Sequence, residues 1–110
     1  MCNCINHYIQ KVTTTDNNVA LTITNSTNMS SLQCINLIVN KNVGANVSGA
    51  PLPVQIVING TAISLLNKYS LPVYSNKLPM RCKYYGYYVA EGNTTPYVIL
   101  QNTPKCKCNA

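Results

Sequence analysis

The dipeptide Asn59-Gly60 constrains the fold of this chain more than any other short segment. It separates two runs dominated by β-branched and aliphatic residues, Val54–Ile58 and Thr61–Leu66. Both central residues of a two-residue type I′ turn need a positive φ angle, which Asn and Gly adopt at little cost. The sequence therefore predicts a tight β-hairpin over residues 54–66.

Similar runs rich in β-branched residues and Tyr recur along the chain, and turn clusters separate them about every eight to twelve residues. We expect further strands over residues 5–14, 19–24, 32–40, 80–90 and 97–101, a short extended piece at 71–74, and a long loop over 41–53. Pro72 confines the 71–74 piece to a sheet edge, and Gly86 indicates a bulge or bend in its strand. No window has helical periodicity. The prediction is one all-β domain over residues 1–110, a compact β-sandwich or barrel of about seven or eight short strands.

The cysteines are placed symmetrically at the two ends of the chain. Cys2-Asn3-Cys4 opens it and Cys106-Lys107-Cys108 closes it. Residues i and i+2 of a strand point to the same face, so four thiols converge if the two terminal segments lie side by side. Such a cluster suits one structural zinc ion, with Zn–S bonds of about 2.3 Å, or two disulfides that join the ends. Four free thiols are the third alternative.

Two observations bear on these alternatives in opposite directions. A single residue between paired cysteines is shorter than the spacing of most structural zinc sites. The segment Met1–His7 lacks the basic region and apolar core of a secretory signal, so we expect folding in a cytosol, where disulfides are rare. His7, the one histidine, is a further candidate ligand beside Cys2 and Cys4. Cys34 and Cys82 lie in expected strands, either as small buried apolar residues or as a third disulfide.

Four tyrosines gather in one expected strand, at Tyr84, Tyr85, Tyr87 and Tyr88. Strand alternation places Tyr85 and Tyr87 on one face and the other two on the opposite face. Tyr is favoured at protein interfaces because its ring buries area while its hydroxyl bonds a partner. Aromatic rings beside basic residues also stack nucleic-acid bases. We expect an interface or core role for these four residues.

The charged residues are few and offer little to catalysis. Lys and Arg number 8 and Asp and Glu 2, which is 9% of the chain and gives a net charge of +6. Asp16 and Glu91 fall in separate expected turns, whereas paired-carboxylate chemistry needs two acids that converge. We therefore expect no catalytic residues and no enzyme. No apolar run is long enough to span a bilayer, and the spread of the positive charges disfavours nucleic-acid binding.

A family resemblance completes the sequence evidence. The stretch Pro53–Thr61 leading to Leu71–Tyr74, the strand Lys83–Tyr88 and the Asn/Thr/Ile/Tyr-rich composition resemble small virion proteins of tailed bacteriophages, particularly crAss-like phages of gut Bacteroidales hosts. The resemblance implies an auxiliary, or decoration, capsid protein assembled in the host cytoplasm and bound in many copies to the major capsid protein or other virion subunits. The alternatives are an adhesion or carbohydrate-binding β module and a nucleic-acid-binding domain.

Overall fold

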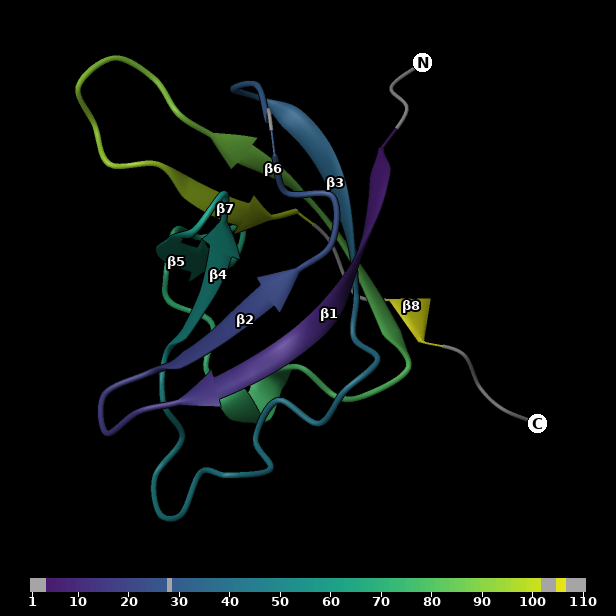
Figure 1. The fold of residues 1–110 in the computed structure, drawn as a ribbon, viewed down its shortest axis with the longest axis vertical. Coiled ribbons are helices and arrows are strands. Elements are labelled where there is room, and N and C mark those ends of the chain that lie inside the picture. The colour runs from purple at the N-terminus through teal and green to yellow at the C-terminus, as the bar shows by residue number, and fades with distance from the viewer. Residues whose placement is uncertain (1–3, 28, 102–104, 107–110) are drawn as a thin grey trace.

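The computed structural model describes residues 4–27, 29–101 and, for the backbone, 105–106, and this part of the chain is all β (Figure 1). A 3₁₀ turn, η1 (Ser75–Lys77), interrupts the strands. The strands are β1 (Ile5–Thr14), β2 (Val19–Ile23), β3 (Gln33–Ile38), β4 (Val54–Ile58), β5 (Thr61–Leu66), β6 (Cys82–Val89), β7 (Tyr97–Leu100) and β8 (Lys105–Cys106).

Seven of these strands close into a barrel. Their order is β3-β1-β2-β4-β5-β7-β6, and the additional pairing of β3 with β6 joins the two ends of the sheet. Closure removes the unpaired edges that an open sheet exposes. The hairpins β1–β2, β4–β5 and β6–β7 are antiparallel. The strand pairs β1–β3, β2–β4 and β5–β7 are parallel. The predicted all-β barrel is confirmed.

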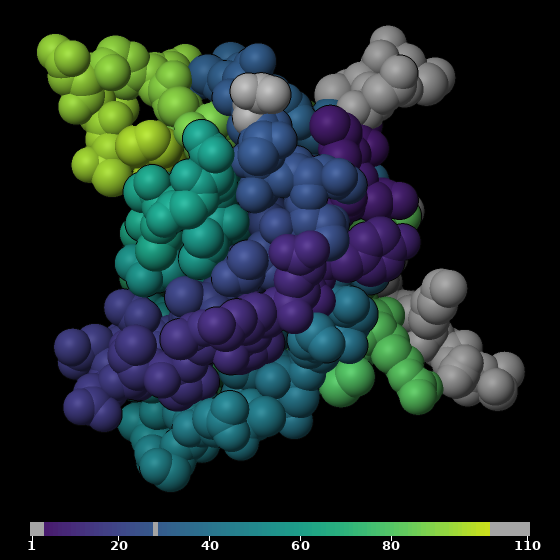
Figure 2. Space-filling view, viewed as in Figure 1, coloured from purple at the N-terminus to yellow at the C-terminus, as the bar shows by residue number. Residues whose placement is uncertain are grey.

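The expected hairpin is present with the expected turn. Ile58 pairs with Thr61, and the two residues between them have positive φ angles, 51° at Asn59 and 81° at Gly60. The 71–74 piece forms isolated bridges rather than a strand, joining Leu66 to Pro72 and Pro53 to Tyr74. The 41–53 loop packs Val43, which is 1% exposed, into the core. In Figure 2 this loop, in teal, forms the lower border of the visible face.

The barrel interior is filled by alternate residues of every strand. In β3, Ile35 and Leu37 are buried two residues apart, as strand alternation requires. In β1 the inward positions shift from His7 and Ile9 to Val12 and Thr14, because a bulge between Ile9 and Lys11 inserts one residue opposite β2. A one-residue insertion exchanges the two faces of a strand. The side-chain oxygen of Asn40 accepts a hydrogen bond from the amide of Ile9 (2.9 Å) beside this bulge.

Of the bulge or bend predicted at Gly86, the bulge is absent. The register of β6 runs without a shift past Gly86, which lies opposite Ile35 of β3 and Leu100 of β7. A Cβ atom at position 86 would collide with the carbonyl oxygen of Ile99 and lie 3.0 Å from the Cα of Leu100. Glycine is needed here because the backbones of two paired strands approach each other closely.

The two described ends of the chain pair with different strands. β1 lies against β3, whereas β8 lies against the start of β6, with Cys82 opposite Cys106. Residues 1–3 and 107–110, on which the expected contact between the termini also depends, lie outside the described residues. Within the described chain, no helix has the length and apolar character needed to cross a membrane.

Candidate functional site

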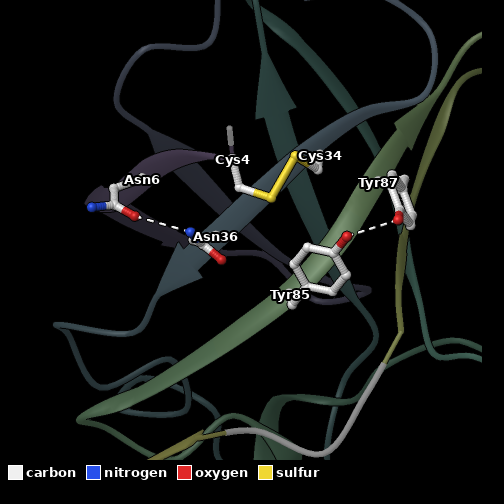
Figure 3. Close-up of a disulfide and its surroundings, with 6 residues drawn as sticks. All are labelled: Cys4, Asn6, Cys34, Asn36, Tyr85 and Tyr87. Carbon is white, nitrogen blue, oxygen red and sulfur yellow. Dashed lines mark hydrogen bonds between the residues drawn. A yellow bond between two sulfur atoms is a disulfide. The ribbon is translucent and has the colours of Figure 1, made fainter. Parts of the chain in front are cut away.

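The outer side of three neighbouring strands forms a nearly uncharged surface, which we call the β1–β3–β6 face. The strand registers arrange its side chains in rows that run across β1, β3 and β6. The three rows, continuing the β1–β3 register by one residue at Cys4, are Cys4–Cys34–Tyr87, Asn6–Asn36–Tyr85 and Tyr8–Ile38–Lys83. Figure 3 shows the six side chains of the first two rows, two from each of the three strands. Lys83 is the one charged residue among these nine.

A disulfide between Cys4 and Cys34 closes the first row. The two Cα atoms lie 4.8 Å apart, within the usual range for a disulfide, and the two residues are separated by 30 positions. Cys34 is 1% exposed. The cross-link fixes the start of β1 against β3, so the parallel pairing of these two strands does not depend on hydrogen bonds alone.

The disulfide corrects two expectations about the cysteines. Cys4 is bonded to Cys34, so its sulfur belongs neither to a zinc site nor to a disulfide with Cys106 or Cys108, and Cys34 is not bonded to Cys82. The physical reason is the register: β8 pairs with residue 82, five residues along β6 from the position opposite Cys34, which is about 17 Å at the usual rise per residue.

The other cysteines and the histidine do not assemble a metal site in the described chain. Cys82 is buried and disulfide-bonded, while Cys2 and Cys108 lie outside the described residues, as does the side chain of Cys106. No group of three or more His, Cys, Asp or Glu side chains that could hold a metal ion occurs among the described residues. His7 is fully buried inside the barrel, and its Nδ1 lies 2.7 Å from the carbonyl oxygen of Thr24.

The second row is held by an amide pair. The Nδ2 of Asn36 donates a hydrogen bond to the Oδ1 of Asn6 (3.2 Å) (Figure 3). Within the described chain, no hydrogen bond uses the remaining Oδ1 of Asn36 or Nδ2 of Asn6. These two atoms give the β1–β3–β6 face one acceptor and one donor in fixed positions.

Two of the four clustered tyrosines belong to this face, and the predicted alternation accounts for the division. The hydroxyl groups of Tyr85 and Tyr87 are 2.7 Å apart, and their rings meet edge to face with centroids separated by 5.5 Å (Figure 3). The hydrogen bond to Tyr87 is the main cause that raises the pKa of Tyr85, with burial adding to it. The phenol of Tyr85 therefore remains neutral well above physiological pH.

Tyr84 and Tyr88 point the other way and pack on the core. Tyr84 is 5% exposed, and its hydroxyl donates a hydrogen bond to the carbonyl oxygen of Lys77 (2.9 Å). Burial raises the pKa of Tyr84. Tyr88 is half-buried against the core cluster. These two rings stabilise the barrel and do not lie on the β1–β3–β6 face.

Sequence reasoning located Tyr85 and Tyr87 through strand alternation, but it missed the asparagine pair and Tyr8. These residues lie on other strands, and their position beside the tyrosines depends on the β1–β3 and β3–β6 registers. The sequence signal that could have suggested Asn6 and Asn36 is the presence of an amide inside each apolar-rich strand. Comparisons with known protein families, with curated proteins and with solved structures find no match to this chain.

Proposed function

We propose that this protein is a structural virion subunit, an auxiliary protein that binds the capsid shell of a tailed bacteriophage through its β1–β3–β6 face. The observation that carries the proposal is the composition of that face: three tyrosines, a hydrogen-bonded asparagine pair and one charge in nine positions. Protein interfaces are enriched in Tyr and depleted in Lys, Glu and Asp at their centres.

The energetics of such a face favour permanent contact with another protein. Burying an unpaired charge costs several kcal/mol, whereas neutral amide and phenol groups regain hydrogen bonds from a partner at much lower cost. Tyr8 is 45% exposed and contributes a further ring at the border of the face. Cys34 is buried, and the other eight residues of the three rows are exposed or half-buried. They correspond to the centre of a standard interface, which involves about 20–30 residues on each side.

The barrel supports the same role. A closed sheet offers few unpaired strand edges, and the Cys4–Cys34 disulfide cross-links two of the three strands beneath the face. A rigid surface loses little conformational entropy when it binds. Following the resemblance to crAss-like phage virion proteins, the partner we propose is the major capsid protein or another virion subunit, and the proposed location is the virion, assembled in the host cytoplasm.

The chemistry of the chain offers little support for an enzyme. Its one histidine is enclosed in the core, with no exposed surface. Asp16 follows β1 and Glu91 follows β6, so the two carboxylates belong to different turns. We therefore propose a binding role without catalysis.

The test is co-sedimentation of the purified protein with empty capsid shells of the phage that encodes it. Wild-type protein should pellet with the shells in a saturable ratio, and Asn6→Lys, which places a charge in the second row, should abolish this. Ser64→Lys is the matched control, because Ser64 is likewise exposed on a strand but lies on β5. No binding by the wild type, or equal loss with both variants, would remove the proposal.

A further inference from the structure

A second surface, which shares no residue with the three rows of the β1–β3–β6 face, forms a hollow at one end of the barrel. It lies where β5 ends at Leu66 and the chain crosses toward β6 through residues 67–81. Its volume is about 380 Å³, and its wall includes Pro72, Val73, Tyr84 and Leu100. Ligand sites often lie at the ends of β-barrels and measure roughly 300–1,000 Å³. We call this site the end hollow.

The segment 69–74, which supplies much of the rim of the end hollow, exposes several large apolar side chains. Tyr69 is 71% exposed, Leu71 57% and Tyr74 41%, all within six residues. Tyr69 and Tyr74 line the hollow, and the Nζ of Lys68 lies 5.3 Å from the centroid of the Tyr69 ring. Clusters of exposed apolar residues around a concavity mark binding sites more often than scattered single ones do.

The rim is held in shape by its own hydrogen bonds. The Oδ1 of Asn67 accepts hydrogen bonds from the backbone amides of Tyr69 (2.8 Å) and Leu71 (3.1 Å). The backbone amide of Asn67 donates to the carbonyl oxygen of Leu71 (2.8 Å). The amide of Val73 donates to the carbonyl oxygen of Leu65 (3.0 Å), which fixes the segment to β5. A preformed rim reduces the entropy lost when a ligand binds.

The charges at the end hollow have one sign. Lys68 and Lys77 both line it, and among the described residues no carboxylate does. The whole sequence has two acidic residues against eight basic ones. A ligand that neutralises the two lysines must therefore supply negative charge, while the apolar wall needs an apolar group to fill it.

We infer that the end hollow binds an acidic peptide segment of a partner protein, whose large apolar side chain enters the hollow while flanking carboxylates pair with Lys68 and Lys77. A sugar fits less well, since Pro72, Val73 and Leu100 offer no hydrogen-bonding side chain to the hydroxyl groups that would face them. Single-stranded nucleic acid needs a basic groove that follows several phosphates, and two lysines do not provide one. This inference uses a different surface from the proposed function and does not depend on it.

The experiment is an amide-resolved NMR titration of the full chain with the peptide Ac-Asp-Glu-Leu-Phe-Glu-Asp-NH₂. Shifts should be confined to residues 67–77 and to Tyr84, Leu100 and Gln101, with a dissociation constant below about 1 mM that weakens as salt is raised. Tyr69→Ala and Lys77→Glu should each weaken binding by roughly threefold to tenfold. Leu32→Ala and Lys41→Glu, exposed residues outside the hollow, are the matched controls and should leave the affinity unchanged.

Three other probes test the competing classes of ligand. The charge-swapped peptide Ac-Lys-Arg-Leu-Phe-Arg-Lys-NH₂, the oligonucleotide dT12 and maltohexaose should each bind more weakly than the acidic peptide. Tighter binding of any of them at the same residues would overturn the inference in favour of that class. Absence of binding by the acidic peptide, or shifts confined to other residues, would overturn it as well.

Discussion

The substitution Gly86→Ala tests whether the close approach of β6 and β7 is a real constraint on the barrel. In an ordinary strand this change stabilises a protein by about 0.5–1 kcal/mol, because alanine loses less conformational freedom on folding than glycine. At Gly86 the added methyl group would collide with the carbonyl oxygen of Ile99 and would lie 3.0 Å from the Cα of Leu100 and 3.1 Å from the carbonyl carbon of Ile99. All three atoms belong to the backbone, so no side-chain rotation relieves the contact.

The expected cost follows from this geometry. β7 must move away from β6, and overpacking of this kind costs about 1–3 kcal/mol, to which weakened ladder hydrogen bonds add about 0.5–1.5 kcal/mol each. After the entropic gain is subtracted, the free energy of unfolding should fall by about 2–3 kcal/mol. For a chain of 110 residues this lowers the Tm by roughly 8–13 °C.

The assay is thermal and urea denaturation followed by far-UV circular dichroism. The matched control is Gly44→Ala, where the added Cβ would lie 3.7 Å from the carbonyl oxygen of Ser75, an ordinary contact. Gly44→Ala should leave the stability unchanged or raise it by about 0.4–1 kcal/mol. If Gly86→Ala proves as stable as the wild type, the argument from the backbone contact is wrong.

Three further predictions concern the disulfide, a buried phenol and a strained backbone position. Cys4→Ala opens the cross-link between residues separated by 30 positions and should lower the free energy of unfolding by about 3–4 kcal/mol in the loop-entropy model. Peptide mapping of the unreduced wild type should show Cys4 joined to Cys34, and a map without that linked peptide would contradict the structure. Burial raises the pKa of Tyr84, so the stabilisation that comes from keeping this phenol neutral is complete below the ordinary pKa of tyrosine near 10 and is lost as the pH rises through the higher folded-state pKa. In urea denaturation between neutral pH and pH values above 10, Tyr84→Phe should therefore lose less stability than the wild type. An unchanged pH dependence would refute the assignment. Leu32 has a φ angle of 66° and is 60% exposed, so Leu32→Asn should raise the Tm by relieving about 1 kcal/mol of backbone strain, whereas a lower Tm would show that the leucine contributes more through packing than it costs.

Much of the secondary structure was predictable because strand periodicity and turn chemistry are local properties. The β1 range was predicted residue for residue as Ile5–Thr14, and the Asn59-Gly60 turn has the expected positive φ angles. The bulge predicted at Gly86 is absent, because a glycine inside a strand fits a bulge or a close backbone approach equally well. The difference between these two lies in the neighbouring strand, which local sequence does not specify.

The candidate sites also differ in how far the sequence predicts them. Alternation within β6 separated Tyr85 and Tyr87 from the two core tyrosines, since that separation needs only the period of one strand. The end hollow was missed because Tyr69 and Tyr74 lie in an irregular segment, where no period indicates which side chains are exposed. The Asx-type turn at Asn67, whose Oδ1 bonds the amides of Tyr69 and Leu71, is the local signal that could have drawn attention to it.

The sequence by itself determined that this chain is all β, where its strands and its tightest turn lie, and which side of each regular strand faces the core. Only the tertiary structure decided that β3 closes the barrel by pairing with both β1 and β6, and that Cys4 is bonded to Cys34 rather than to the other end of the chain. The physical reason is the range of the interactions. Turn dihedral angles and side-chain alternation act over a few residues, whereas strand order, register and disulfide partners depend on the free energy of the whole closed sheet.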